Sequence, residues 1–387
     1  TGNNGDVKTV DISIQSATGE RIDQGSRDVE LAPTPTRARF TLSGLTGPVV
    51  QGEVRLETDD SLSFDDVLYF TLEVQPPKEV LIVSDNYATK ANFFRTALSP
   101  PELEELGDSP YRTTVIDTAQ FASADLSRID VVCWLDVGRP GFNDWRALQR
   151  FLEGGGGGVL FLGPNVDPAA YLESTAQEIL PADLLARRPF EDAEQFDVRN
   201  LTHPLLRAFA EWDTSELASV NVTRHWRTEP ADDATVIVPY TDSRETPAIV
   251  ERLVGMGRIV MITTPFDRSE WSNLVTSVNV AVVLSDQLVQ YVSQNSDERY
   301  NYTAGQVPVV QLAEDLDIRQ LLVRKPDRTQ PARDIPAGAE EVAIEDARLL
   351  GNYRLFPRNA ELKFERGFSM NAVASESNLS RMGASDL

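Results

Sequence analysis

Hydrophobic and polar residues alternate through the first part of the chain, up to about residue 75. At residues 7–14, for example, Val10, Ile12 and Ile14 share one side of an extended chain. This period of two is typical of strands that bury one face. Turn residues separate the runs and no helical period interrupts them, which favours an antiparallel β-sandwich. The predicted strands are residues 7–14, 29–31, 38–42, 49–56 and 67–74.

The pattern changes after Pro76 and Pro77. Residues 80–83 form a continuous apolar run, as expected of a strand buried on both faces, and residues 143–152 carry apolar side chains at helical spacing. Strands and helices that alternate in this way predict a mostly parallel sheet with helices on both faces. The predicted strands are residues 80–83, 113–116, 129–135, 159–162, 235–240, 248–254 and 258–263, and the predicted helices are residues 89–98, 143–152 and 278–293.

Residues 167–226 fit this alternation less well. They contain two helical stretches, at 169–179 and 204–211, and we expect them to form an insertion or a cap. After about residue 296, short alternating runs return and predict a second small β-sandwich. Its predicted strands are residues 307–312, 320–323, 341–344, 351–356, 360–364 and 368–373.

The predicted domains are therefore a β-sandwich at residues 1–76, an α/β domain at residues 77–296 and a second β-sandwich at residues 297–375. Residues 376–387 form a polar tail. Both ends of the sequence look cut from something longer.

Composition narrows the classes of function. The 387 residues are 41% hydrophobic and 25% charged, which is ordinary for a soluble globular protein, but the net charge is −24. Binding to nucleic acid or to an anionic membrane needs a basic surface, so neither is expected. No run of 18 apolar residues occurs, so we expect nothing in the sequence to span a membrane.

The glycine run Gly154–Gly158 suggests a nucleotide-binding loop at first sight. Glycines that hold phosphates follow a strand and open a helix, whereas these follow a predicted helix and open a predicted strand. Glycine just after a helix is a common way to end it. The run is therefore interpreted as a helix end, and no cofactor is expected.

The turn after the predicted strand 159–162 is where chemistry would be expected. Ligands and catalytic groups of open α/β sheets lie beyond the carboxyl ends of the strands. A hydrolase or an amidotransferase would place a serine or cysteine at such a turn, but this chain has Gly163, Pro164 and Asn165. The domain looks built like an enzyme but lacks the nucleophile.

The remaining nucleophile and base candidates fit structural roles. The single cysteine, Cys133, lies inside the apolar run 129–135, as a buried thiol would. His203 precedes Pro204 where a helix should begin, which is a capping signal, and His225 is expected at a strand end. A triad would need an exposed cysteine beside a histidine. No catalytic residue is predicted, and no set of ligands at close spacing predicts a metal site.

One group of polar residues is the candidate site. Each member follows a predicted strand, so parallel strands would bring them to one edge of the sheet. The functional interpretation is a polar pocket or a cation site. The alternative is that these Asp and Asn side chains cap the helices that follow. The group is Asp85, Asn86, Asp136, Asn165 and Asp267, with Trp271 as an aromatic residue that could line a pocket, although an aromatic there is more often core.

Several stretches resemble known proteins. Residues 59–70, DDSLSFDDVLYF, resemble the end of an adhesion-type immunoglobulin-like β-sandwich. Residues 78–86 and 92–101 look like the start of a class I glutamine amidotransferase-like domain, and residues 130–137, 151–163, 203–206 and 251–267 continue that likeness. Residues 368–373 and 375–379 are similar to the tail of the same proteins. The ordered set resembles the Bat-like, aerotolerance-related membrane proteins of bacteria.

The resemblance implies a fold and a location. The fold is a flavodoxin-like or amidotransferase-like mostly parallel sheet flanked by two antiparallel β-sandwich domains. Such proteins usually carry membrane helices at both ends and often a von Willebrand A domain. This sequence lacks them, so it would be the extracytoplasmic part, with residues 376–387 leading to a membrane segment. No catalytic residues carry over.

The expected function is therefore protein interaction or scaffolding at the cell envelope by a pseudoenzyme, with a protein partner. An alternative is a module that binds a small molecule or a carbohydrate in the crevice at the strand edge. A third interpretation is an enzyme with a nonstandard mechanism built on the carboxylates at that edge.

Overall fold

The computed structural model forms two compact units. An α/β unit comprises Pro76–Ser296, and a β unit combines Thr1–Gln75 with Asp297–Leu387. The structure describes residues 6–16, 19–32, 36, 38–45, 47–58, 66–74, 76–86, 90–211, 214–293, 300–312, 316–359, 361–362 and 364–373. The motif at residues 59–65 and the tail at residues 376–387 lie outside the described residues.

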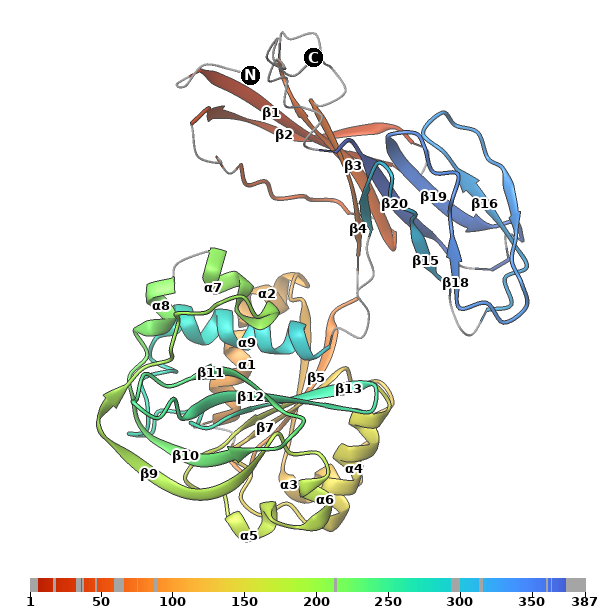
Figure 1. The fold of residues 1–387 in the computed structure, drawn as a ribbon. Coiled ribbons are helices and arrows are strands. Elements are labelled where there is room, and N and C mark those ends of the chain that lie inside the picture. Colours follow the sequence, from red (N-terminus) through yellow and green to blue (C-terminus); the bar gives the residue numbers. More distant parts are fainter. Residues whose placement is uncertain are drawn as a thin grey trace, which may run out of the picture. The chain divides into compact units, whose positions relative to one another are not determined.

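A seven-stranded sheet forms the centre of the α/β unit (Figure 1). Its strand order is β11-β12-β13-β8-β7-β5-β6, and the five strands from β13 to β6 are parallel. The hairpin partner β12 and the edge strand β11 run antiparallel. The strands are β5 (Lys78–Val83), β6 (Tyr111–Ile116), β7 (Val131–Leu135), β8 (Gly157–Phe161), β11 (Thr235–Pro239), β12 (Pro247–Val254) and β13 (Gly257–Ile262).

Alternate residues of the central strands bury opposite faces of this sheet. Val80 and Ile82 belong to one hydrophobic core with helices α1 (Asn92–Leu98) and α9 (Val278–Val292). Leu81 and Val83 belong to a second core with α4 (Phe142–Glu153). The continuous apolar run of β5 is thus explained by burial on both sides, as predicted. The mostly parallel sheet predicted from the sequence is confirmed.

Residues 167–226 contain a feature that the sequence pattern did not predict. A two-stranded antiparallel ribbon, β9 (Ala182–Glu194) and β10 (Val222–Pro230), lies within the expected cap. Much of β9 is exposed, and its polar sequence shows no alternation that would reveal a strand. The short helices of the unit are α2 (Pro101–Leu106), α3 (Thr118–Phe121), α5 (Pro168–Tyr171), α6 (Ser174–Gln177), η2 (Pro204–Leu206), α7 (Arg207–Glu211) and α8 (Thr214–Ala218).

The β unit contains three antiparallel or mixed sheets. A four-stranded sheet has the order β2-β1-β3-β4 and a five-stranded sheet the order β14-β20-β19-β16-β17, while β15 and β18 pair separately. The strands are β1 (Val7–Gln15), β2 (Arg21–Glu30), β3 (Val49–Leu56), β4 (Val67–Glu73), β14 (Asn301–Thr303), β15 (Val309–Gln311), β16 (Gln320–Arg324), β17 (Ala332–Asp334), β18 (Glu341–Ala343), β19 (Gly351–Pro357) and β20 (Arg366–Asn371).

The two ends of the chain meet within this unit. Gln51 of β3 donates from Nε2 to the carbonyl of Tyr353 at 2.8 Å, and the hydroxyls of Thr71 and Ser369 lie 2.7 Å apart. All four of these side chains are buried. The sequence analysis treats the two terminal segments as separate sandwich domains, whereas the structure packs them as sheets of one unit.

Two predicted strands of the β unit are wrong. Residues 38–42 are extended but pair with no strand, and the described residues among 360–364 form a turn. Gly25 lies at a bulge inside β2, where it has φ +113° and the register with β1 shifts. Glycine adopts this conformation without the Cβ clash that other residues would suffer.

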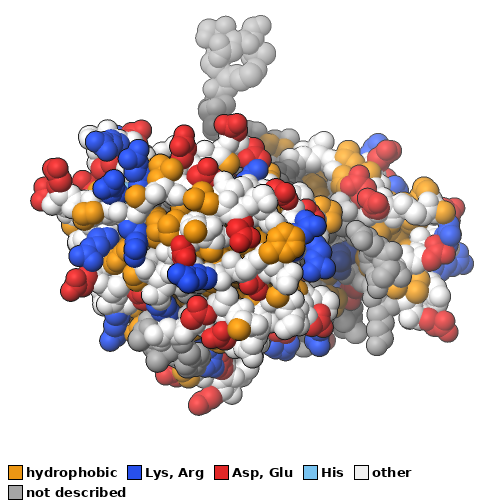
Figure 2. Space-filling model, turned by 90° about the horizontal axis from the view of Figure 1, so that it is seen from below, with side chains coloured by type: hydrophobic (Ala, Val, Ile, Leu, Met, Phe, Trp, Pro, Cys, Tyr) orange, Lys and Arg blue, Asp and Glu red, His pale blue; other side chains and the backbone are white. Residues whose placement is uncertain are grey.

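Charged side chains of both signs are spread over one face of the molecule (Figure 2). On the face drawn in Figure 2, Asp and Glu lie among Lys and Arg, with hydrophobic side chains between them. Within the described residues, no helix combines the length and the apolar character needed to cross a bilayer.

Candidate functional site

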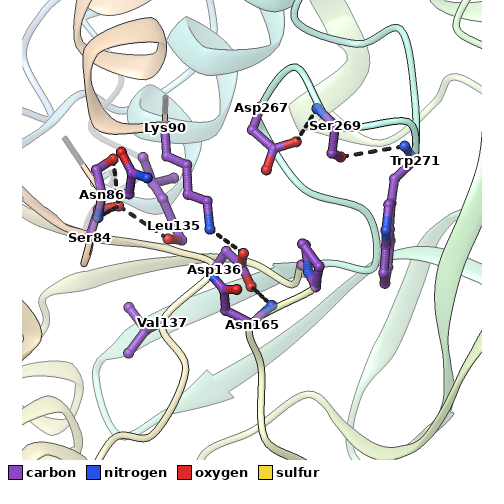
Figure 3. A network of polar contacts seen from close by, with 12 residues as sticks. Ser84, Asn86, Lys90, Leu135, Asp136, Val137, Asn165, Asp267, Ser269 and Trp271 are labelled. Atoms are coloured by element: carbon purple, nitrogen blue, oxygen red, sulfur yellow. Dashed lines mark hydrogen bonds and ion pairs between the residues drawn. The ribbon is translucent and has the colours of Figure 1, made fainter. Parts of the chain in front are cut away.

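The candidate site lies at the carboxyl edge of the seven-stranded sheet. β5 has β6 on one side and β7 on the other, so the chain reverses its direction of travel across the sheet at β5. Such a switch point is where open α/β sheets usually bind ligands. The predicted residues come from the ends of β5, β7, β8 and β13, and the structure brings them to this one edge (Figure 3).

Asp136 lies deepest in the site. Its side chain is 2% exposed, and it follows β7 in a left-handed conformation with φ +53°. Its Oδ1 accepts a hydrogen bond from the backbone N–H of Asn165 at 2.9 Å, and its Oδ2 accepts one from the ammonium of Lys90. Asp tolerates the left-handed region better than most residues. An aspartate at position 136 therefore suits both the turn and the ion pair.

Opposing effects act on the pKa of Asp136. Burial raises it, because the charged form loses hydration, and the nearby carboxylate of Asp267 raises it further. Lys90 and the Asn165 N–H lower it by stabilising the charged form. Burial outweighs these partners, so the pKa of Asp136 lies above its usual value.

Lys90 belongs to this cluster, although it is not among the residues predicted from the sequence. It lies in a π-type turn just before α1, and its side chain is 8% exposed. A lysine almost never buries its ammonium without a partner. The sequence feature that could have suggested Lys90 is its position as a lone lysine just before the helix that follows β5.

Gly163 permits the close packing around this ion pair. A Cβ at Gly163 would lie 2.5 Å from Cγ of Asp136, which is closer than carbon atoms approach without displacement. The Gly163-Pro164-Asn165 turn therefore has a steric reason for its glycine. The carboxylate of Asp136 occupies the space where a larger side chain would lie.

Two predicted site residues have their carboxylates tied to neighbouring backbone. Asp85 is exposed, and its Oδ1 accepts from the hydroxyl of Thr118 at 2.5 Å and from the Thr118 N–H at 3.3 Å, at the start of α3. Asp267 is 6% exposed, and its Oδ1 accepts from the Ser269 N–H at 2.8 Å. Neither carboxylate caps the helix that follows its strand, because Asp85 accepts from the first residue of α3 and Asp267 accepts within its own loop.

The other predicted residues differ in exposure. Asn86 and Asn165 have exposed side chains at this edge. Trp271 is only 6% exposed and belongs to the second hydrophobic core, and its carbonyl accepts from the Thr223 N–H at 2.7 Å. Trp271 is therefore a core residue with little surface to offer a ligand.

The candidate nucleophile and bases lie in unrelated surroundings. Cys133 is fully buried in the middle of β7, and burial raises the pKa of its thiol. His203 caps η2 and lies 3.1 Å from Glu251. His225 stacks on Phe190 with the ring centroids 4.1 Å apart, and burial lowers its pKa to about 4.

The glycine run has the structural role predicted for it. α4 ends at Glu153 and β8 begins at Gly157, and Gly155 between them has φ +99°. A Cβ at Gly157 would lie 2.6 Å from atoms of Val292 in α9, so the strand and the helix need a glycine to pack closely.

Two cavities lie away from this edge. One of about 460 Å³ is lined by Phe151 and Gly154 to Gly156 at the amino end of β8, and one of about 590 Å³ is lined by Asp197, Arg199 and the turn between β11 and β12. Neither is lined by any of the six predicted site residues. Among the described residues, no group of three or more His, Cys, Asp and Glu side chains is placed to hold a metal ion.

Comparison with known proteins gives likenesses of fold only. No family model and no curated protein matches the sequence. A cytoplasmic protein from Salmonella typhimurium, STM3548, aligns at 15% identity over 56% of this chain and 98% of its own, with a TM-score of 0.43. A ThuA-like protein from Bacteroides uniformis aligns at 14% identity over 56% of this chain and 93% of its own, with a TM-score of 0.40.

A third likeness extends further along the chain. A β-galactosidase from Bacillus circulans aligns at 12% identity over 70% of this chain and 42% of its own, with a TM-score of 0.40. ThuA-like proteins have a glutamine amidotransferase-like fold. At identities below 25% and TM-scores below 0.5, none of these likenesses bears on activity.

Proposed function

We propose that this chain is the non-catalytic, extracytoplasmic region of a membrane-anchored bacterial protein of the Bat-like kind. In this proposal the α/β unit is a class I glutamine amidotransferase-like pseudoenzyme, and immunoglobulin-like segments flank it in the sequence. Its role is protein interaction or scaffolding at the cell envelope.

One observation carries the proposal. At the switch point, where an enzyme of this architecture would place its reacting groups, a buried ion pair between Lys90 and Asp136 fills the space. Both side chains are less than 10% exposed, and both charged ends are taken by partners within the fold. A substrate could reach the Asp136 carboxylate only by breaking this pair and leaving a charge buried alone, which is costly.

The nucleophile chemistry points the same way. The reactive form of cysteine is the thiolate, and burial in apolar surroundings suppresses it at Cys133. Neither histidine of the chain contacts Cys133: His203 is held by Glu251 and Tyr291, and His225 by aromatic rings. Within the described residues, Cys133 therefore has no base to activate it.

An activity assay tests the proposal. The purified chain, incubated with glutamine and with a simple ester, is expected to show no hydrolysis above background. Matched variants Cys133→Ala and Asp136→Asn identify the source of any turnover that does occur. Turnover that is lost in a folded Cys133→Ala or Asp136→Asn protein would overturn the proposal.

Location needs a separate test in cells. The full-length gene product should sediment with membranes, and this region should be cut by protease added to the outside of intact spheroplasts. Protection of the region until the cells are lysed would contradict the extracytoplasmic location.

A second function, binding of a neutral small molecule or carbohydrate, has one observation in its favour. The side-chain amide of Asn165 is exposed at the carboxyl edge and makes no hydrogen bond with the described residues. A thermal-shift screen with neutral sugars tests it, because a ligand of the folded state raises the unfolding midpoint. A shift that disappears in Asn165→Ala would favour this function, and no shift with any sugar would reject it.

A further inference from the structure

Four arginines lie at the centre of the β9–β10 ribbon. The register pairs Arg224 with Pro189, His225 with Arg188, Trp226 with Arg187 and Arg227 with Ala186. Arg187 and Arg188 are thus consecutive on β9, and Arg224 and Arg227 lie across from them on β10. All four are exposed, in a chain that has 60 acidic and 36 basic residues.

The four arginines form two pairs on opposite faces of the ribbon. Residues directly opposite each other in antiparallel strands share a face, and successive residues alternate between faces. Arg187 and Arg224 therefore lie on the face that carries Trp226. Arg188 and Arg227 lie on the other face, which carries His225.

The face with Trp226 is the one at the candidate site. Trp226 donates from Nε1 to the carbonyl of Gly163 at 2.9 Å, and Arg187 donates from Nη1 to the carbonyl of Pro164 at 2.9 Å. The guanidinium of Arg187 also lies 5.7 Å from the centroid of the Trp226 ring. These contacts place Arg187 beside the turn that follows β8, at the carboxyl edge, and Arg224 lies two residues from Trp226 on the same face of the ribbon.

Of the three predicted carboxylates at this edge, Asp136 and Asp267 are buried and Asp85 is exposed, whereas Arg187 and Arg224 are both exposed. The carboxylates of Asp85, Asp136 and Asp267 accept hydrogen bonds within the fold. No carboxylate of the described residues pairs with Arg187 or Arg224, although the protein as a whole carries an excess of acid. Like charges on one face of a ribbon repel each other, and an acidic ligand would relieve that repulsion.

We infer that the Arg187/Arg224 pair docks a short acidic segment of a protein partner, an inference that rests on the proposed interaction function. Guanidinium groups bind carboxylates through two parallel hydrogen bonds. Diagonal neighbours on a ribbon are about 7–8 Å apart. Alternate residues of an extended chain are about 6.6 Å apart on one side, so two acidic side chains at positions i and i+2 fit the pair.

The size of the site selects a short segment over an extended polyanion. The ribbon carries acidic residues to either side of the arginines, at Asp183 and Glu229 and again at Glu191 and Asp192. A membrane surface or a nucleic acid would meet these residues and the net charge of −24 at close range. A segment with two or three carboxylates meets only the arginines.

A binding assay on the whole chain tests the inference. A fluorescently labelled hexaglutamate peptide is titrated with wild type and with the Arg187→Gln/Arg224→Gln variant at low salt. The matched control is Arg188→Gln/Arg227→Gln, which removes the same charge from the opposite face. We expect the first variant to bind about tenfold more weakly or worse, with the control near wild type.

Several outcomes would overturn the inference. Equal weakening in both variants would mean attraction to net charge only. If free succinate or inorganic phosphate binds as tightly as the peptide, and this binding also needs Arg187 and Arg224, the site is a small-anion site. If phosphatidylglycerol vesicles bind in a way that needs Arg187 and Arg224 and the peptide does not, the site is a lipid surface.

A variant with one substitution distinguishes weaker binding from loss of the fold. Arg187 contacts Pro164 and Trp226, whereas the side chain of Arg224 makes no contact of this kind with the described residues. Arg224→Gln should therefore keep the wild-type circular dichroism and unfolding midpoint and still weaken peptide binding severalfold. Unchanged binding by Arg224→Gln would overturn the inference, and it would leave the proposed lack of catalysis untouched, since that is read by hydrolysis.

Discussion

At Asp136, burial and an ammonium partner act on one carboxylate in opposite directions. Burial disfavours its charge, while Lys90 and the Asn165 N–H favour it. The pair can be buried only while both members are present, because removal of one leaves the other as a buried, unpaired charge. The site is thus more sensitive to single substitutions than to paired ones.

We expect Lys90→Met to lower the free energy of unfolding by about 3–5 kcal/mol at pH 7, measured by urea denaturation, because it leaves Asp136 unpaired. The double variant Lys90→Met/Asp136→Asn should recover part of this loss, since it buries no charge. Arg112→Met is the matched control, because the Arg112–Glu79 pair is exposed, and such pairs contribute less than about 1 kcal/mol. A cost below about 1 kcal/mol for Lys90→Met would mean that the ion pair is effectively solvated.

His225 predicts a pH dependence of stability. Its pKa is about 4 in the folded protein, against 6.5 for an unperturbed histidine, so the unfolded chain binds the proton more tightly. Stability from this group is complete above pH 6.5 and is lost as the pH falls towards 4, by about 3 kcal/mol in total. His225→Phe should flatten that part of the curve, because the ring still stacks on Phe190 and cannot titrate.

Measurement of unfolding free energy from about pH 7.5 to 4 in both proteins checks this prediction. At the upper end of that range the His225→Phe protein should be at least as stable as wild type, because the buried Nδ1 of His225 has no hydrogen-bond partner to lose. Parallel curves for the two proteins between pH 6.5 and about 4 would contradict it.

The residues of the candidate site could be predicted from the sequence, but their burial and their ion pairing could not. Asn86, Asp136, Asn165 and Asp267 lie at one edge of the sheet (Figure 3) because parallel strands end together, and Asp85 precedes Asn86 after β5. Their burial could not be predicted, because it depends on the pairing of Asp136 with Lys90, and a lone lysine before a helix does not identify its partner. The exposed arginines were not predicted as a pair, because the ribbon that carries them has no apolar period to reveal its strands.

Among the elements, β4 shows how an edge strand is protected. Asn371 of β20 accepts from the Tyr69 N–H at 2.7 Å and donates to the Tyr69 carbonyl at 2.9 Å. Asn301 of β14 does the same to Thr71, at 2.9 and 3.1 Å. Two side-chain amides thus replace the backbone of a neighbouring strand, which satisfies the groups that an open edge would expose.

We expect Asn371→Ala to lower the free energy of unfolding of the β unit by about 1–3 kcal/mol, because it leaves the N–H and the carbonyl of Tyr69 without a partner. Asn359→Ala is the control, since Asn359 is exposed and its side chain accepts the Glu361 N–H in a turn. Its effect should stay within about 0.5 kcal/mol in the same urea titration. Equal effects would show that water replaces the amide of Asn371 without cost.

Elements with a buried face were predictable and exposed ones were not. β3 was predicted with its observed bounds: apolar residues lie at both of its ends, and its first four residues are buried. β2 was predicted only at its end, since it lies at a sheet edge, exposes nearly every side chain and is held by backbone pairing with β1. Residues 38–42 alternate like a strand, yet no strand of the structure pairs with them.

For the whole molecule, the two units predict different outcomes on excision. Residues 76–296 contain both hydrophobic cores of their sheet and should unfold cooperatively when produced alone. Residues 1–75 alone lack Asn301, Asn371 and the buried partners of Gln51, and should give no cooperative transition. Circular dichroism melts and the dispersion of amide NMR signals check both, and a folded 1–75 fragment would contradict the shared unit.

The shared unit also sets an order of events during synthesis on the ribosome. The hydrogen bond between the Tyr69 N–H and Asn371 can form only after Asn371, 302 residues later in the chain, has been synthesised. At about 5–20 residues per second, that interval is about 15–60 s. Throughout it, the α/β unit can emerge and fold, while the edge of β4 remains open to any other strand in the cell. Residues 1–75 are thus synthesised early in this chain but completed late, and the time for which the edge of β4 stays open is set by the elongation rate as much as by its final contacts.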